Sequence, residues 1–379
     1  MSAPVPPPRP GGSAVGDTEQ LVDRDPARAR TLPSRAYLDR AWLAAERDLV
    51  FRGTWQWAAA VADLASPGDY VTTDIAGEPV LLVRQDDGDL RALSNVCRHR
   101  AGPVADGCGH ARAFTCGYHG WRYHLDGSLA SAREMGDPAP FDPNDVHLPT
   151  FRLETWSGFA FVDLSGSAPP LGDHLGEIIE EVAPFIGRDD GGVALVAERS
   201  DVIACNWKTY IDNYLEGYHI PYVHPRLHRI LDTPAYRVEP RRFHSRQHAP
   251  LRTGTDHVYD RAAEPVLYYW LYPNIMLNVY PGNVQLNVVT PVDAEQTRTW
   301  FAWFARPPAD DAERRSLDEA VALAGEVQDE DIAICEAVQR GLRSRTYDRG
   351  WYSTRHEGGV HHFHRLLCEA LSTTSASGT

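Results

Sequence analysis

The chain has no long run of apolar residues, and this lack argues against a membrane protein. Its longest apolar stretches fall far short of the ~18–20 residues that cross a bilayer as a helix. The segment Met1–Ala14 carries five prolines and lacks the apolar core of a secretory signal peptide. We therefore expect a soluble, cytoplasmic protein with no membrane partner.

Cysteine is also scarce, with six residues among 379. Six cysteines are too sparse for a disulfide framework in a chain of this size. In a reducing compartment, cysteines that cluster with histidines are better explained as metal ligands. A metal site is therefore expected where these cysteines lie close to histidines in the sequence.

Basic residues are outnumbered, because 37 Lys and Arg face 52 Asp and Glu and leave a net charge of −15. Such a protein repels polyphosphate, so we expect no nucleic-acid partner. A basic protein or a cationic small molecule could still bind. The chain also lacks a GxGxxG dinucleotide motif and a second, ferredoxin-like cysteine cluster, so it should not oxidise NAD(P)H itself.

What is present predicts an α+β protein of two domains. Residues 1–34, rich in Pro, Gly, Ala and charge, predict a mobile arm. Residues 35–53 predict a helix with a partly apolar face and Ser34 as its cap. Short β-rich segments between turns predict a small all-β domain over 54–166. The mixture of helices and long aromatic strands over 167–379 predicts a second domain around one curved sheet.

The first chemical motif lies in the all-β region and has the spacing C-x-H-x16-C-x2-H, formed by Cys97, His99, Cys116 and His119. Two thiolates can hold one iron of a [2Fe–2S] cluster while two imidazoles hold the other. Replacing two anionic ligands by neutral ones raises the reduction potential. A structural zinc site is the alternative, but zinc sites usually pair their ligands as C-x2-C and H-x3-5-H. The alternating order favours the iron–sulfur cluster.

A second C-x-H sequence, Cys108-Gly109-His110, lies between the two pairs. It is only a few residues from Cys116, so the loop between them would be short. Its use would also leave Cys97 and His99 without a metal. We therefore expect Cys108 and His110 not to be ligands.

These loops resemble the Rieske loops of the α subunits of ring-hydroxylating oxygenases, through Asn-Val-Cys-Arg-His-Arg and Cys-Gly-Tyr-His-Gly-Trp-Arg-Tyr-His-Leu-Asp-Gly. The resemblance extends from about residue 37 to the His-rich tail. Ala101 stands where the family usually has Gly, and Gly117 where it usually has Pro. Both departures should affect loop stiffness more than ligation. The family implies a Rieske domain plus a catalytic domain whose curved antiparallel sheet is packed by helices, in a helix-grip or START-like fold.

The second motif lies in 206–225. At ~100° per residue, a helix here would place Asp212, Glu216 and His219 on one face. His224 lies five residues beyond His219 and would point elsewhere if the helix continued. Pro221 follows His219 and Pro225 follows His224. Both prolines disfavour a continuous helix and let the chain bend back. Two histidines and a carboxylate with open positions form the facial triad of O₂-activating ferrous enzymes.

The resemblance selects among the candidate ligands of this mononuclear iron. The H-x4-H spacing favours His224 over His228 as the partner of His219. The late helix contains Asp329-Glu330-Asp331, and Asp331 best matches the position of the family's carboxylate, with Asp329 as the first alternative. Asn213 and Tyr210 are expected near the iron. The tail histidines His361, His362 and His364 are expected to belong to a packed C-terminal helix or to subunit contacts rather than to a metal site.

The resemblance also gives Glu216 a role, because the family places a carboxylate there, usually Asp. That carboxylate joins a Rieske histidine of a neighbouring subunit to an iron-ligand histidine, here His119 and His219, and carries electrons between the two metal sites. The alternative is that Glu216 has no role in electron transfer and is a solvated or helix-capping residue. Glu in place of Asp resembles the subgroup that oxidises quaternary ammonium compounds such as carnitine and betaines, as do the segments 335–342 and 357–364.

The implied function is the oxygenase component of a Rieske non-haem iron oxygenase, which performs O₂-dependent hydroxylation or N-dealkylation of a small amine or betaine. Electrons would come from a separate NAD(P)H-dependent reductase, with or without a ferredoxin, and the family implies a homotrimer. The alternatives are an aromatic-ring dioxygenase or O-demethylase, and a Rieske electron carrier without oxygenase activity. Aromatic residues of the late strands are candidate walls of a pocket for a cation; they are Tyr268, Tyr269, Trp270, Tyr272 and Tyr280.

Overall fold

The computed structural model describes residues 18, 20–136, 141–186, 192–252, 254, 259 and 266–372. The chain divides into two compact units. Among the described residues, one unit is Phe51–Leu171, and the other combines the segment that ends at Val50 with everything from Gly172 onwards. No helix of the described part of the chain is both long and apolar enough to cross a membrane.

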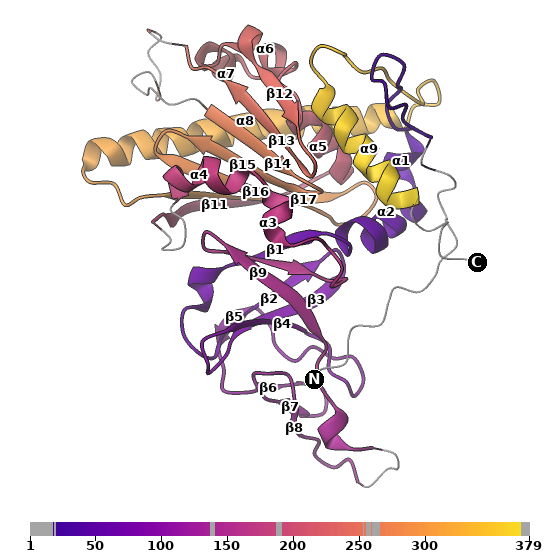
Figure 1. The fold of residues 1–379 in the computed structure, drawn as a ribbon, viewed down its shortest axis with the longest axis vertical. Coiled ribbons are helices and arrows are strands. Elements are labelled where there is room, and N and C mark those ends of the chain that lie inside the picture. The colour runs from indigo at the N-terminus through magenta and orange to yellow at the C-terminus, as the bar shows by residue number, and fades with distance from the viewer. Residues whose placement is uncertain are drawn as a thin grey trace. The chain divides into compact units, whose positions relative to one another are not determined.

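The first unit is all-β, as predicted (Figure 1). A seven-stranded antiparallel sheet has the strand order β1-β10-β9-β4-β3-β2-β5, and a small sheet has the order β6-β7-β8. The strands are β1 (Trp55–Ala60), β2 (Asp69–Ile75), β3 (Glu78–Arg84), β4 (Leu90–Ser94), β5 (Cys108–His110), β6 (Phe114–Thr115), β7 (Arg122–Tyr123), β8 (Leu129–Ser131), β9 (Thr150–Trp156) and β10 (Phe159–Asp163).

Strand β3 is buried on both faces, which gives this unit two hydrophobic cores. Val80 and Leu82 point into one core, while Leu81 and Val83 point into the other, as the alternation of side chains along a strand requires. The second core includes Cys97. The predicted cluster loops are therefore anchored to one face of the sheet.

The two predicted cluster loops have matching backbone turns. The N–H of Ala101 donates to the carbonyl of Cys97, and the N–H of Gly120 donates to the carbonyl of Cys116, each over 3.0 Å. The closing residue of each turn is left-handed, with φ of 58° at Ala101 and 70° at Gly120. Glycine adopts this conformation freely, whereas a Cβ clashes with the backbone. Ala101 therefore carries strain that Gly120 does not.

The second unit has a seven-stranded antiparallel sheet of order β11-β17-β16-β15-β14-β13-β12, packed by helices, which confirms the predicted α+β fold (Figure 1). Helix α5 lies against both the long helix α8 and strand β16. The strands are β11 (Ala194–Ile203), β12 (Arg237–Pro240), β13 (His244–Ala249), β14 (Val266–Leu271), β15 (Ile275–Tyr280), β16 (Asn283–Pro291) and β17 (Thr297–Ala305). The helices are α1 (Arg35–Leu38), α2 (Arg40–Glu46), α3 (Leu171–Leu175), α4 (Ile178–Ile186), α5 (Trp207–Tyr214), α6 (Ile220–Val223), α7 (Pro225–Ile230), α8 (Asp311–Leu342) and α9 (Gly358–Ser372).

The predicted N-terminal arm is shorter than expected. Residues 1–17 and 19 lie outside the described residues, but 20–34 pack against the C-terminal part of the chain. Leu32 is buried, and the guanidinium of Arg30 lies 3.9 Å from the ring centre of Trp351. These contacts link segments more than 300 residues apart, which the local composition of the arm could not indicate.

The predicted helix over 35–53 is interrupted. Asp39 is extended, with φ −85° and ψ 123°, so it ends α1 and its carboxylate caps α2 by accepting from the N–H of Ala41. A π-helical turn, Arg47–Phe51, follows. Ser34, the expected cap, makes no capping hydrogen bond, because its backbone is already helical.

A buried ion pair joins α2 to the start of α5. Lys208 Nζ lies 2.7 Å from Glu46 Oε1, and both side chains are fully buried. The indole N–H of Trp207 donates to the other oxygen of Glu46 over 2.8 Å. Burial raises the pKa of Glu46 and lowers the pKa of Lys208, and each partner opposes that change in the other. An unpaired buried charge costs several kcal/mol, about 3–5 when one partner is removed, so the pair holds α2 against the first turn of α5.

The strain at Ala101 predicts that Ala101→Gly stabilises the first unit. Removing a left-handed alanine relieves roughly 1–2 kcal/mol, and the added freedom of the unfolded chain offsets about 0.4–1 kcal/mol of that gain. We expect a higher midpoint for the thermal loss of the visible absorbance of the predicted cluster.

Two matched glycine substitutions control for the loop position. Gly120→Ala should lower the midpoint, because it introduces the same strain in the equivalent turn. Gly117→Ala should have little effect, because Gly117 is not left-handed and a Cβ there meets no atom within 4 Å. A lower midpoint for Ala101→Gly would contradict the strain argument.

Candidate iron–sulfur cluster and mononuclear iron sites

The structure brings the two halves of the first motif together. Cys97 and Cys116 are each 3 % exposed and belong to one core. The rings of His99 and His119 lie 4.6 Å apart, centre to centre, and His119 is exposed. The loops approach so closely that a Cβ added to Gly102 would lie 3.1 Å from Cys116 Sγ. Two sulfurs on the buried side and two imidazoles nearer the surface form the donor set that a Rieske [2Fe–2S] cluster requires.

The hydroxyl of Tyr123 is placed so that it can donate to the sulfur of Cys97. Tyr123 Oη accepts from the N–H of Arg98 over 2.9 Å and lies 3.2 Å from Cys97 Sγ. Since Arg98 supplies the donor in the first bond, the phenolic proton can point to the sulfur. Burial and the neighbouring sulfur raise the pKa of Tyr123, so this donor keeps its proton. Hydrogen bonds to cluster sulfurs are one way in which proteins tune the reduction potential.

The nearby Cys108-Gly109-His110 sequence has a different environment. These three residues form β5 at the edge of the large sheet, and all three are exposed. His110 Nδ1 pairs with Asp69 Oδ1 at 3.0 Å. The structure therefore gives Cys108 and His110 a place in the sheet, outside the two matching turns.

Helix α5 ends at Tyr214, so the expectation that Asp212 shares a helical face with Glu216 and His219 is wrong. Asp212 still lies in the helix, and its carboxylate accepts from the hydroxyl of Tyr37 over 2.7 Å and pairs with the buried His364 at 2.8 Å. Asp212 thus belongs to a structural network with the C-terminal helix α9.

Beyond the end of α5 the chain makes a tight turn, which the side chain of Glu216 stabilises. Its carboxylate accepts from the backbone N–H groups of Tyr218 and His219. The turn packs tightly, since a Cβ on Gly217 would lie 2.8 Å from the ring of Tyr236. Glu216 consequently faces His219 through a local turn rather than through helical periodicity.

The two histidines stand at the starts of two short helices. Helix α6 begins directly after His219, and α7 begins directly after His224, which has non-helical φ −118° and ψ 74°. Pro221 and Pro225 lie in the first turn of these helices, where a missing N–H is tolerated. The chain thus changes direction between the two histidines, as the positions of the prolines predicted.

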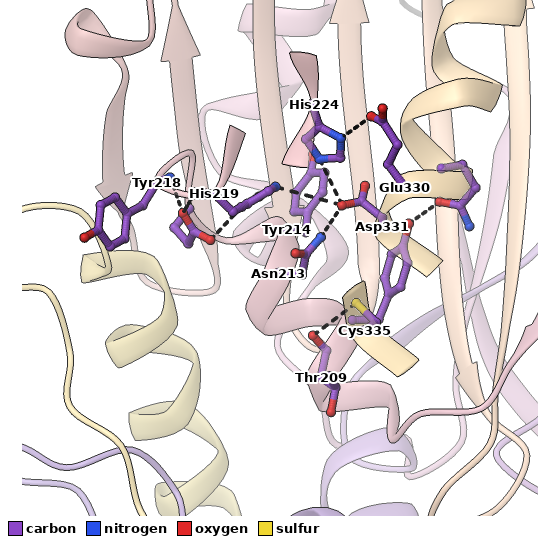
Figure 2. A network of polar contacts seen from close by, with 12 residues as sticks. Thr209, Asn213, Tyr214, Tyr218, His219, His224, Glu330, Asp331 and Cys335 are labelled. Carbon is purple, nitrogen blue, oxygen red and sulfur yellow. Dashed lines mark hydrogen bonds and ion pairs between the residues drawn. The ribbon is translucent and has the colours of Figure 1, made fainter. Parts of the chain in front are cut away.

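His219, His224 and Asp331 converge on one point (Figure 2). Asp331 Oδ1 lies 3.1 Å from His224 Nε2 and 3.9 Å from His219 Nε2, and the three ligand atoms all lie within 4.8 Å of one another. Asn213 donates to the same carboxylate oxygen over 2.6 Å. Two imidazole nitrogens and one carboxylate are the donor set that non-haem ferrous enzymes use.

Each of these histidines has its own carboxylate on the opposite ring nitrogen. His219 Nδ1 lies 2.6 Å from Glu216 Oε1. His224 Nδ1 lies 2.7 Å from Glu330 Oε2, as Figure 2 shows. With Nδ1–H donating to a carboxylate, Nε2 carries the lone pair that a metal needs. Burial alone would lower the pKa of His224, but Asp331 and Glu330 outweigh it and raise the pKa, so the site favours positive charge.

The rival ligand candidates lie elsewhere. Asp329 is 67 % exposed at its side chain and pairs with Arg199 at 2.6 Å. His228 Nδ1 lies 3.1 Å from the hydroxyl of Thr233. Sequence reasoning missed Glu330, because an acidic residue next to two others on a helix has no feature that distinguishes it from a solvated side chain.

A cavity of about 740 Å³, including its open mouth, adjoins this constellation. Of the five predicted wall residues, Tyr268 and Tyr280 line it, and their hydroxyls lie 3.1 Å apart. Tyr269 points to the other face of β14, where its hydroxyl donates to Glu181, and Trp270 donates to the carbonyl of Pro273. The aromatic lining residues are Tyr210, Tyr214, Tyr236, Tyr259, Tyr268, Tyr280 and Phe301.

The charges around the cavity are of one sign apart from the two histidines. Glu216 and Asp331 are acidic, and the described lining residues include no Lys or Arg. Burial raises the pKa of Tyr268 and of Tyr280, so both remain neutral phenols. The amide-bearing lining residues, none of which except Asn213 was predicted, are Asn213, Asn278, Gln285, Asn287 and Gln328. The cavity suits a small molecule with positive charge.

Comparison with known proteins places both units in families. Residues 54–152 match the Rieske [2Fe–2S] domain, and residues 190–373 match the ring hydroxylating alpha subunit (catalytic domain). Choline monooxygenase of Arabidopsis thaliana is 35 % identical over 93 % of this chain and 87 % of its own. The oxygenase subunit of carnitine monooxygenase of Escherichia coli is 34 % identical over 92 % of this chain and 95 % of its own.

Solved structures agree with the sequence comparison. The structure of a quaternary ammonium Rieske monooxygenase superposes with a TM-score of 0.82 at 28 % identity and covers 91 % of this chain and 96 % of that one. Such α subunits work with O₂ and a separate reductase. The chain belongs to the Rieske-type ring-hydroxylating oxygenase α subunits, monooxygenases and dioxygenases that combine a Rieske [2Fe–2S] cluster with a mononuclear non-haem iron.

Proposed function

We propose that this chain oxidises a small quaternary ammonium compound, by hydroxylation or N-dealkylation, as the oxygenase component of a multi-protein system. Cys97, His99, Cys116 and His119 would hold the cluster, and His219, His224 and Asp331 would hold the iron. The observation that carries the proposal is the cavity beside Asp331, which is walled by tyrosines and carries acidic charge without Lys or Arg among its described lining residues.

The tyrosines supply the chemistry that a quaternary ammonium ion needs. Such an ion has no N–H to donate, so it binds through the faces of aromatic rings and through nearby carboxylates. Tyr236, Tyr268 and Tyr280 come from different parts of the second unit, yet the rings of Tyr268 and Tyr280 meet edge to face at 5.7 Å and Tyr236 stacks with Tyr268 at 6.3 Å. The three rings therefore form one continuous aromatic wall of the cavity, and each ring face that a cation contacts contributes roughly 0.5–2 kcal/mol.

An aromatic-ring substrate fits this cavity less well. A neutral arene gains nothing from the acidic charge of Glu216 and Asp331 in the cavity wall, whereas a cation is attracted by it. The relatives named above act on choline and carnitine, both quaternary ammonium compounds. These two observations favour the amine reaction over ring dioxygenation and O-demethylation.

The residues around the iron site have separable tasks. A bound ferrous ion would supply O₂ activation with electrons from the cluster. Asn213 holds the Asp331 carboxylate by its 2.6 Å hydrogen bond. Glu216 and Glu330 hold the Nδ1 protons of the two histidines and fix their ring orientation. Apolar side chains of the lining exclude water from the reacting centre; they include Leu227, Leu323 and Val327.

We propose that Glu216 also connects the two metal sites, with the cluster and the iron on neighbouring subunits. Its side chain is 10 % exposed and holds His219, while the neighbouring Tyr218 and Tyr222 are strongly exposed. We propose, from the resemblance to the family, that His119 of a second copy approaches Glu216 in a homotrimer. The reductase partner would use NAD(P)H, directly or through a ferredoxin.

The ligand assignment predicts that Asp331→Ala loses about one iron per chain and keeps the visible Rieske spectrum. Removing one of three protein ligands from an open site weakens metal binding strongly, whereas the cluster has separate ligands. Iron and acid-labile sulfide on anaerobically purified protein measure both sites. Asp329→Ala is the matched control and should keep all its iron. Full iron retention by Asp331→Ala would move the carboxylate ligand elsewhere.

The bridge assignment predicts that Glu216→Gln still binds both metals but loses turnover. The amide cannot accept from two imidazoles as a carboxylate does, so electron transfer between the sites should fail. The measurement is single-turnover reoxidation of the reduced cluster by O₂ in the presence of substrate. Glu326→Gln, on the exposed surface beside Arg226, should behave as wild type. Undiminished reoxidation in Glu216→Gln would overturn the bridge.

A substrate panel tests the proposed reaction itself. Anaerobically reduced enzyme is mixed with O₂ and either trimethylammonium compounds or simple arenes, and products are identified by mass spectrometry. We expect oxidised or dealkylated amine, with formaldehyde where an N-methyl group is lost, and no arene diol. Diol formation without amine oxidation would establish the ring-oxidising alternative instead.

A further inference from the structure

A row of amides crosses the cavity on strands β15 and β16. Asn278 and Gln285 face each other in the register of the two strands, and Asn278 Nδ2 donates to Gln285 Oε1 over 3.2 Å. The hydroxyl of Tyr214 donates to Asn278 Oδ1 over 2.6 Å. Asn287 lies two residues beyond Gln285 on β16, so its side chain points to the same face of the sheet. All four residues line the cavity.

Asn287 differs from its neighbours because its acceptor is unused. The residue is 2 % exposed, and its Oδ1 is buried without a hydrogen-bond partner. A buried carbonyl oxygen without a donor is unfavourable, and native proteins keep few of them. Here the unpaired oxygen belongs to a residue of the cavity wall, where a ligand can supply the missing donor.

We propose that Asn287 accepts a hydrogen bond from a hydroxyl group of the substrate and thereby selects quaternary amino alcohols over quaternary amino acids. The inference rests on the proposed function and deepens it, because it assigns the second pole of the substrate. The tyrosines bind the cation, and Asn287 binds the hydroxyl. A substrate carboxylate has no proton to donate to Oδ1 and would share the cavity with the carboxylates of Glu216 and Asp331.

Three ligands with the same trimethylammonium group separate these contributions. Choline carries a hydroxyl, propyltrimethylammonium carries a methyl group in its place, and glycine betaine carries a carboxylate. Their dissociation constants are measured by calorimetric titration of the intact, fully metallated enzyme without O₂. We expect choline to bind about tenfold more tightly than propyltrimethylammonium, the factor for one hydrogen bond to a buried acceptor. Glycine betaine should bind more weakly than choline.

Substitution of Asn287 tests whether this residue causes the preference. Asn287→Leu keeps a branched side chain but removes the acceptor, so the tenfold ratio of choline to propyltrimethylammonium should fall to about one. Asn274→Leu is the control, because Asn274 is also a buried amide with an unpaired Oδ1 but does not line the cavity. It should keep the tenfold ratio. If Asn287→Leu does not fold, Asn287→Asp keeps an acceptor and should keep the preference for choline.

The outcomes distinguish this inference from the proposed function. Equal binding of choline and propyltrimethylammonium, or a ratio that survives Asn287→Leu, would overturn the hydroxyl contact while the cation site stands. Tighter binding of glycine betaine than of choline would overturn it as well. Failure of all three ligands to bind would overturn the proposed function, and the inference with it.

Discussion

The proposed iron site depends on the point at which α5 stops being helical. A helix that continued past Tyr214 would point His219 and His224 about 140° apart around its axis, so both could not face Asp331. Two glycines allow close packing around this turn: a Cβ on Gly217 would lie 2.8 Å from the ring of Tyr236, and a Cβ on Gly359 of α9 would lie 2.5 Å from the carbonyl of Leu215. Other elements pack closely against the backbone where the chain leaves the helix, and the carboxylate of Glu216 accepts from the N–H groups of Tyr218 and His219, which have no helical partners.

The same turn supplies one of two carboxylates that orient the histidines, while a distant element supplies the other. Glu216 belongs to the turn itself, so its contact with His219 is local. Glu330 comes from the long helix α8, one residue before Asp331, so α8 delivers both a proposed metal ligand and an orienting group. A shift of α8 would disturb both at once, which makes the packing of α5 against α8 part of the site.

The parts of the site that sequence could predict are those encoded within a few residues. Cys97 and His99, or His219 and His224 with their prolines, carry their spacing in the chain, and family resemblance then singled out Asp331. Periodicity failed for Asp212, because it assumes an unbroken helix, whereas α5 ends at Tyr214 and the turn that follows packs against Tyr236 and Gly359, which are distant in sequence. The predicted N-terminal arm was likewise too long, because part of it is held by contacts such as that of Arg30 with Trp351, which lies far away in sequence.

The residues that line the cavity were harder still to predict from the local sequence. Alternation along β14 explains why Tyr268 and Tyr269 face opposite sides, but no pattern shows which side holds the cavity. Tyr214 and Tyr236 come from a helix end and a turn, where aromatic residues usually serve packing. The sequence could not single out Asn287 for a different reason. Its distinguishing feature is a buried Oδ1 without a hydrogen-bond partner, which can be recognised only in the three-dimensional structure.

Charge balance connects the metal and the proposed substrate. Glu216, Glu330 and Asp331 place three carboxylates around two imidazoles, so a ferrous ion would leave one formal negative charge in ionised form. In a partly buried site, screening by water is weak, and the remaining charge attracts a cation. The carboxylates that would surround the iron therefore also favour a positively charged substrate once the iron is bound. A zwitterion brings no net charge to this balance, whereas an amino alcohol brings its whole positive charge and a hydroxyl for Asn287.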